Sequence, residues 1–104
     1  MVNKQIILVW EKAISVINQD PTRRRKDICG AWIDFDAYGN RNSNFGWEID
    51  HIIPISKGGS DDMENLQPLH WMNNAAKGDG DLVCKVKANG SDNKIDPTYD
   101  ILFE

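Results

Sequence analysis

The sequence predicts an α+β domain, and three patterns carry this prediction. Near the N-terminus, apolar residues recur every three or four positions, which is typical of a helix with one buried face. In the middle, two short extended stretches precede a segment with helical composition. Near the C-terminus, an Asn-Gly pair follows an alternating stretch, which predicts a hairpin turn. The chain has 104 residues, so we expect a single domain over 1–104.

The charge and composition of the chain narrow the classes of function. The formal net charge of −4 argues against binding of nucleic acid by bulk positive charge. A nuclease is compatible with this charge, because a bound divalent cation and a local basic strip can offset it. The apolar run at 6–10 is shorter than a signal peptide or a membrane span requires. We therefore expect a cytoplasmic protein with no membrane partner.

The two cysteines, Cys29 and Cys84, are too few for a disulfide scaffold. Their spacing alone leaves a single bridge between them open. Free thiols in a reducing compartment are the simpler interpretation, and we adopt it as the expectation.

The N-terminal helix is expected over residues 3–18. Its apolar face consists of Ile6, Val9, Trp10, Ala13, Ile14 and Ile17. The segment before Pro21 should end it, because the residue before a proline avoids the helical region. The most basic cluster follows and contains Arg23, Arg24, Arg25 and Lys26. Two interpretations of this cluster stay open, a solvated loop and a contact with the phosphate backbone of nucleic acid.

The remaining elements are expected to be short. We expect strands at 29–36, 47–53 and 66–70, a loop of turn-forming residues at 37–44, a compact loop at 57–62 and a helix at 71–77. Asn65 closes the compact loop and Gly78 ends the helix. In the tail, alternation at 82–86, the turn at 89–90 and a returning strand at 99–103 predict a hairpin that covers one side of the core.

Both histidines of the chain, His51 and His70, lie in the stretch 46–79. Hydrolysis of a phosphodiester needs a base for water, a cation and a positive group on the phosphate. Histidine suits the first role, and oxygen ligands from Asp and Asn suit Mg²⁺ or Mn²⁺. Strand alternation puts Asp50 and His51 on opposite faces. A ligand and a base there would converge if the strand twists into the loop at Pro54.

Four motif blocks in this stretch resemble the HNH endonuclease family. They are Asp-His-Ile-Ile-Pro at 50–54, Lys-Gly-Gly-Ser at 57–60, Asn-Leu-Gln-Pro-Leu at 65–69 and Asn-Ala-Ala-Lys-Gly-Asp at 74–79. The resemblance covers about a third of the chain. It implies a ββα-metal core at 46–79, in which two strands, a loop and a helix form a metal site. The flanks at 25–33 and 84–90 also resemble small phage-like and bacterial members.

The resemblance implies a role for each motif residue. His51 corresponds to the general base, and Asp50 and Asn74 correspond to the protein ligands of one divalent cation. Asn65 corresponds to the middle asparagine, which supports the loop and orients the histidine through the backbone. Lys77 lies where the family often has a basic residue close to the phosphate. Further candidate contacts with nucleic acid are Arg23, Arg24, Arg25 and Lys57.

The sequence departs from the family pattern at the residues that bind the catalytic cation and the structural zinc. Asn74 replaces a histidine, and this oxygen ligand favours Mg²⁺ or Mn²⁺ over Zn²⁺. Many members hold a structural zinc with two Cys-x-x-Cys pairs, but here His70 and Asn73 replace the second pair and Cys29 lacks its near partner. We therefore expect no structural zinc. Packing of Trp32 and the terminal hairpin should stabilise the domain instead.

His70 has two possible roles. The preferred one is structural, as a histidine at the end of a strand in the region of the lost zinc. In the other, the helix begins one residue early, His70 and Asn74 share one helical face, and His70 reaches the cation.

The resemblance implies a metal-dependent endonuclease that hydrolyses DNA phosphodiester bonds and cuts one strand per active site. Cutting both strands of double-stranded DNA would then require a second protomer or a second nick. The acidic charge predicts weak non-specific affinity, and hence a homodimer or a targeting partner. The alternative is a non-catalytic module on the same fold that binds nucleic acid or another protein.

Overall fold

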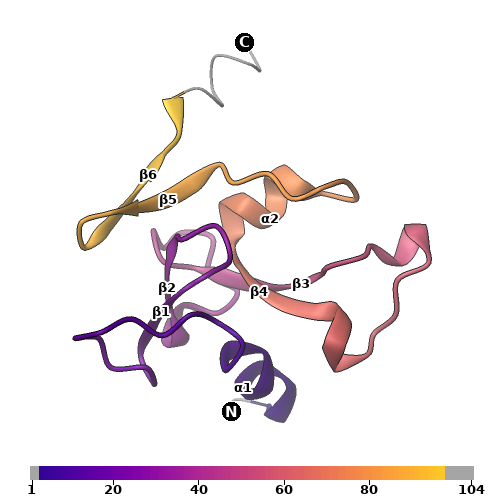
Figure 1. The fold of residues 1–104 in the computed structure, drawn as a ribbon, viewed down its shortest axis with the longest axis horizontal. Coiled ribbons are helices and arrows are strands. Elements are labelled where there is room, and N and C mark those ends of the chain that lie inside the picture. The colour runs from indigo at the N-terminus through magenta and orange to yellow at the C-terminus, as the bar shows by residue number, and fades with distance from the viewer. Residues whose placement is uncertain (1–2, 98–104) are drawn as a thin grey trace.

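The computed structural model describes residues 3–97 and consists of small antiparallel sheets and short helices (Figure 1). The helices and strands are α1 (Lys4–Trp10), β1 (Arg24–Lys26), β2 (Trp32–Asp34), β3 (Trp47–His51), β4 (Leu66–His70), α2 (Trp71–Lys77), β5 (Val86–Asn89) and β6 (Asp92–Ile95). Single 3₁₀ turns lie at Phe35–Ala37, Ile55–Lys57 and Met63–Asn65. The strands pair as β1–β2, β3–β4 and β5–β6. This mixture confirms the α+β class.

The core lies between α1 and the β3–β4 pair. Its buried side chains include Val9 and Trp10 from α1, Ile33 from β2, Trp47 from β3 and Leu66 from β4. The rings of Trp10 and Trp47 are 5.4 Å apart between centroids. In Figure 1, α1 lies on one side of β3 and β4, and α2 lies on the other. Both faces of β3 are therefore covered, one by the core and one by α2.

Helix α1 is shorter than the predicted helix over 3–18. It ends at Trp10, and Ile14 instead forms an antiparallel bridge with Lys26. Ile17, which the helical spacing placed on the buried face, is 88% exposed. The β-branched residues at 14, 16 and 17 are weak helix formers, and backbone pairing with β1 satisfies Ile14 outside a helix. The prediction was wrong past Trp10.

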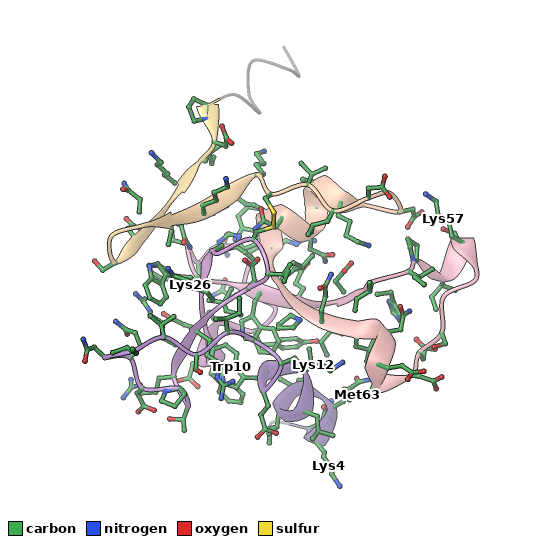
Figure 2. The ribbon with its side chains drawn as sticks, viewed as in Figure 1. Lys4, Trp10, Lys12, Lys26, Lys57 and Met63 are labelled. Atoms are coloured by element: carbon green, nitrogen blue, oxygen red, sulfur yellow. A yellow bond between two sulfur atoms is a disulfide. The ribbon has the colours of Figure 1, made fainter. Side chains whose placement is uncertain are left out.

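A lysine fixes the chain just after α1. Lys12 Nζ donates to the carbonyl oxygen of Leu66 at 2.8 Å and also to that of Met63. Figure 2 shows Lys12 beside Met63, with Trp10 close by. This contact joins the segment after α1 to the start of β4. It therefore attaches the N-terminal part of the chain to the core side of the β3–β4 pair.

The cysteines form a disulfide between Cys29 and Cys84, and the prediction of free thiols was wrong. The bond joins residues 55 positions apart, with 5.3 Å between their Cα atoms. It links the turn before β2 to the segment before β5. The spacing of the two cysteines gave no sign of this proximity, which arises from the tertiary fold.

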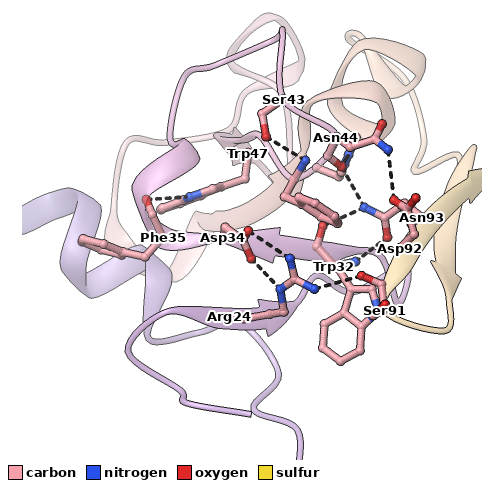
Figure 3. Close-up of polar contacts among 12 residues, drawn as sticks. Arg24, Trp32, Asp34, Phe35, Ser43, Asn44, Trp47, Ser91, Asp92 and Asn93 are labelled. Carbon is pink, nitrogen blue, oxygen red and sulfur yellow. Dashed lines mark hydrogen bonds and ion pairs between the residues drawn. The ribbon is translucent and has the colours of Figure 1, made fainter.

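The C-terminal hairpin exists, with its turn next to Asn89 as predicted. Its returning strand is β6, and the predicted strand at 99–103 lies outside the described residues. Trp32 Nε1 donates to the Gly90 carbonyl at 2.7 Å, and Trp32 N donates to Asn93 Oδ1 at 2.8 Å. Figure 3 shows Asn93 beside Trp32. The hairpin is therefore joined to Trp32 by hydrogen bonds from both its backbone and its side chain.

Candidate active site

A cleft of about 530 Å³ lies between the end of β3, the end of α2 and the turn after Pro54. Its lining includes Asp50 and His51 from β3, and Asn74 and Lys77 from α2. The four residues are separated by up to 27 positions in sequence, from 50 to 77, and the fold brings them to one place. The expected convergence of Asp50 and His51 near Pro54 is thus present.

The β3–β4 register and the direct β4–α2 junction produce this arrangement. Asp50 pairs with Gln67 and His51 with Leu66 in the antiparallel ladder. Helix α2 begins at the residue after β4 and returns across β3. Alternate β3 residues face α2, because strand side chains alternate between faces. The side chains of Glu48 and Asp50 contact α2 through Asn74 and Lys77.

Asp50 is held by an ion pair and a hydrogen bond. Its Oδ1 lies 3.2 Å from Lys77 Nζ, and its Oδ2 accepts a hydrogen bond from Gln67 Nε2 at 2.9 Å. Lys77 also donates to the carbonyl oxygen of His51 at 2.9 Å. Both charged side chains are buried, at 5% and 3% exposure. Lys77 is thus tied to the strand that carries Asp50 and His51.

His51 contacts an acidic residue outside the predicted set. Its Nε2 lies 2.7 Å from Oδ1 of Asp61, a side chain that is 85% exposed. A carboxylate oxygen accepts a hydrogen bond, so Nε2 is the donor, and in the neutral ring Nδ1 then has the lone pair. Sequence reasoning missed Asp61 because the contact depends on the return of the loop toward β3. No local pattern signals this return.

Asn65 joins the two ends of that loop. Its Oδ1 accepts from Ile53 N at 2.9 Å, and its Nδ2 donates to the carbonyl oxygens of Ile53 at 2.9 Å and Ser60 at 2.7 Å. Ile52 N donates to the Asn65 carbonyl at 2.8 Å. A side chain on Gly59 would bring its Cβ within 1.7 Å of the Ile53 carbonyl oxygen, so only glycine fits there. Asn65 therefore supports the backbone that follows His51.

Asn74 is oriented by Glu48 from the neighbouring strand. Its Nδ2 donates to Glu48 Oε1 at 2.8 Å. Glu48 in turn accepts two hydrogen bonds from Arg41, each 2.8 Å long. The Arg41 guanidinium is the main reason that the pKa of Glu48 is lowered, and the hydrogen bond from Asn74 lowers it further. Neither Arg41 nor Glu48 was singled out in the sequence.

His70 has a structural position at the start of α2. Its Nδ1 accepts from Met72 N at 3.1 Å, and its Nε2 lies 2.7 Å from the Asn44 carbonyl oxygen, to which it donates. Burial, the largest influence, lowers the pKa of His70. Both ring nitrogens are engaged, so neither has a lone pair for a cation. This agrees with the preferred structural role.

A buried polar network beside His70 was not predicted. Asp27 accepts hydrogen bonds from the backbone of Cys29, Ala31 and His70 and from Asn73 Nδ2. Asn73 also exchanges two hydrogen bonds with the backbone of Val86 in β5. This network joins α2 to the C-terminal hairpin next to the disulfide.

Three residues of the basic cluster, Arg24–Lys26, form β1, so the loop interpretation was wrong for them, whereas Arg23 lies before the strand. Arg24 makes two hydrogen bonds with Asp34, at 2.7 and 3.0 Å (Figure 3). Its guanidinium lies 4.3 Å from the ring centroid of Phe45. Arg25 donates to three backbone carbonyls, and Arg23 is exposed. Lys57 is exposed in the turn next to the cleft. The structure thus leaves Arg23 and Lys57 more accessible than Arg24 and Arg25.

Asp50 and Asn74 can supply a carboxylate and an amide oxygen to a cation in the cleft. No group of three or more His, Cys, Asp or Glu residues that could hold a metal exists within 3–97. Mg²⁺ does not need such a group, because it keeps several waters and takes one or two protein ligands. The residues present therefore fit a hard cation better than they fit Zn²⁺.

Two antiparallel strands and the helix that follows them thus place Asp50, His51 and Asn74 in the lining of one cleft. Residues 39–80 match the family model described as HNH endonuclease, which confirms the resemblance seen in the motifs. The similarity to the HNH endonuclease family thus lies in residues 39–80, and it indicates a nuclease-type function in general. No curated protein and no solved structure gave a significant match. Within 3–97, no helix has the length and apolar character needed to cross a membrane.

Proposed function

We propose that this cleft hydrolyses phosphodiester bonds in DNA with one divalent cation, Mg²⁺ or Mn²⁺, held by Asp50 and Asn74. The observation that carries the proposal is the presence of Asp50, His51 and Asn74 in the lining of one cleft. The cation would neutralise charge on the phosphate and on the leaving oxygen. Together with the HNH match over 39–80, this composition supports a ββα-metal centre.

His51 is the general base of the proposed reaction. Its Nδ1 accepts a proton from the attacking water, while Asp61 holds the Nε2 proton and sets the orientation of the ring. Asn65 fixes the backbone on the loop side of His51, and Lys77 fixes the His51 carbonyl. These three residues act as positioning residues for the base.

Contacts with the DNA backbone are assigned to basic residues around the cleft. Lys57 is exposed next to the cleft, so it is the first candidate for a phosphate near the cut. Lys77 lines the cleft, and its charge lies beside Asp50. Figure 2 shows Lys26 of the β1 cluster and Lys57 on opposite sides of the molecule. Any contacts of DNA with Arg23, Arg24 and Arg25 would therefore lie far from the phosphodiester bond that is cleaved.

The proposed substrate is double-stranded DNA, nicked in one strand by each centre. The net charge of −4 supports weak affinity for DNA by the domain alone. We therefore propose that a second copy or a targeting partner supplies further affinity. We also propose that residues 1–104 form a single domain. The Cys29–Cys84 disulfide provides the cross-link that a structural zinc gives many relatives, so none is proposed.

The cytoplasmic location expected from the sequence stays a prediction. Disulfides form and persist mainly in oxidising compartments. The Cys29–Cys84 bond is therefore an argument for an oxidising location instead.

Plasmid nicking tests the proposed reaction. Supercoiled plasmid should become open circles with Mg²⁺ or Mn²⁺, give little product with Zn²⁺ and stay intact with EDTA. His51→Ala should lower the rate by roughly 100-fold or more, the usual contribution of a general base. Asp62→Asn, a change in the neighbouring exposed loop, serves as the control. Equal rates for wild type and His51→Ala, or nicking that survives EDTA, would contradict the mechanism and favour a non-catalytic binding module.

A further inference from the structure

Glu48 lies between an arginine and the amide of Asn74. Its carboxylate accepts Arg41 Nε on Oε2 and Arg41 Nη2 on Oε1, each at 2.8 Å. The same Oε1 accepts Asn74 Nδ2 at 2.8 Å. The side chain of Glu48 is 21% exposed, and the Arg41 guanidinium lies 5.8 Å from the ring centroid of Trp71. Arg41 thus holds both carboxylate oxygens of Glu48 in place independently of Asn74.

The polarity of these groups decides the orientation of the amide. A carboxylate only accepts hydrogen bonds, whereas an asparagine amide has a donor end and an acceptor end. Glu48 therefore selects the Nδ2 end of Asn74. The opposite end is Oδ1, which receives no hydrogen bond from any group within 3–97. Asn74 itself lines the cleft that contains Asp50.

We infer that Glu48, held by Arg41, is a positioning residue that directs the Asn74 oxygen toward the cation site. The inference rests on the proposed ligand role of Asn74 and adds the reason why this oxygen is presented. Groups that orient ligands in this way commonly change metal affinity when removed.

The same contact selects an amide at position 74. A carboxylate in its place would put two acceptors against each other at the 2.8 Å separation now occupied by a hydrogen bond. An aspartate is ordinarily the stronger ligand for a hard cation. Glu48 reverses this preference, because only a side chain with a donor end satisfies its carboxylate. The identity of residue 74 and that of residue 48 are therefore coupled.

A double-mutant cycle with Mn²⁺ alone tests this coupling, with affinity measured by calorimetry on the oxidised protein. The variants are Asn74→Ala, Asn74→Asp, Glu48→Gln and the combination of Asn74→Asp with Glu48→Gln. Asn74→Ala should weaken Mn²⁺ binding, and Glu48→Gln should weaken it by roughly 10- to 100-fold. Asn74→Asp should also bind more weakly than wild type. In the combination, Glu48→Gln should instead strengthen binding, because the glutamine amide can donate to the new carboxylate.

The reversal of sign is the deciding result. If Glu48→Gln weakens binding in both backgrounds, Glu48 acts through its charge or as a ligand, and the inference is overturned. No effect in either background also overturns it. If Asn74→Ala leaves Mn²⁺ affinity unchanged, the ligand assignment of the proposed function fails and the inference fails with it.

Two further variants guard against general effects. Glu64→Gln removes one exposed carboxylate from the Met63–Asn65 turn and should leave Mn²⁺ affinity unchanged. Arg41→Gln removes the ion pair that holds Glu48. The Arg41 side chain is 55% exposed, so the fold should tolerate this substitution. It should weaken Mn²⁺ binding less than Glu48→Gln does. Unchanged affinity in Arg41→Gln, with Glu48→Gln unfolded by circular dichroism, would overturn the inference.

Discussion

Lys77 Nζ lies 3.2 Å from Asp50 Oδ1, and both side chains are almost fully buried. Buried charges lose hydration, and the remaining hydrogen bonds from Gln67 and to the His51 carbonyl help to offset that loss. Asp50 is also a proposed ligand of a divalent cation. The same carboxylate thus has an ammonium as its partner within the protein and a metal ion as its proposed partner in function.

Lys77→Met should destabilise the domain and make its stability depend on Mg²⁺. Removing one member of a buried pair leaves an uncompensated charge, at a cost of roughly 3 kcal/mol. A cation at Asp50 would compensate that charge, so Mg²⁺ should raise the free energy of unfolding more for Lys77→Met than for wild type. Urea unfolding with Mg²⁺ and with EDTA measures both values. Lys57→Met, at an exposed position, should resemble wild type. An equal Mg²⁺ effect in all three proteins would contradict the prediction.

Reduction of the Cys29–Cys84 bond should lower the stability of the protein. The bond closes a loop of 55 residues, and the chain-entropy treatment gives about 4 kcal/mol for a loop of this size. Urea unfolding with and without a phosphine reductant measures the loss. A Cys29→Ser, Cys84→Ser double variant should match the reduced wild type and ignore the reductant. Equal stability of oxidised and reduced wild type would contradict the structure in this region.

His70 should make the protein less stable in mild acid. Burial lowers its pKa in the folded state from the ordinary value of 6.5, so the unfolded chain takes up the proton first as the pH falls. The contribution of His70 is therefore complete above about pH 6.5 and is lost as the pH falls through the lowered pKa. Free energies of unfolding measured between about pH 7.5 and 5 should fall more steeply for wild type than for His70→Asn, which keeps a capping side chain. Parallel curves for the two proteins would show that His70 does not titrate in this way.

Asp61→Asn should lower the rate of nicking, because the substitution weakens the contact that orients the His51 ring. The carboxylate is 85% exposed, and an exposed pair contributes at most about 1 kcal/mol, so we expect a loss in kcat of roughly fivefold or less. KM should stay unchanged, since the side chain is not assigned to DNA. Asp62→Asn removes the same charge from the next residue and provides the matched control. A change in KM of similar size in both variants would assign the effect to the charge of the loop.

The elements of the cleft were predictable because their signals are local. Pro54 and Gly78 mark the ends of the strand region and of the helix, and the four motif blocks follow one another without a long insertion. The prediction of a helix past Trp10 failed, because a β-branched segment can pair as an extended strand as readily as it can continue a helix. At Ile14 the partner is Lys26 of β1, which the spacing of apolar residues does not indicate.

The partners of the site residues were not predictable in the same way. Glu48 contacts Asn74 across 26 positions, and the backbone N–H of His70 donates a hydrogen bond to Asp27 across 43 positions. Such contacts depend on the placement of whole elements. The residue types were visible in the sequence, but a glutamate in a strand carries no sign of which helix side chain will face it.

The Cys29–Cys84 bond has a consequence for a broken chain. A single cut in the backbone anywhere between the two cysteines leaves the fragments covalently joined. A cut next to the exposed Asp61 would put Asp50 and His51 on one fragment and Asn74 and Lys77 on the other. On a non-reducing gel the protein would still migrate as one species. A nicked domain would thus retain all four residues of the cleft in one molecule, and reducing agent would separate them.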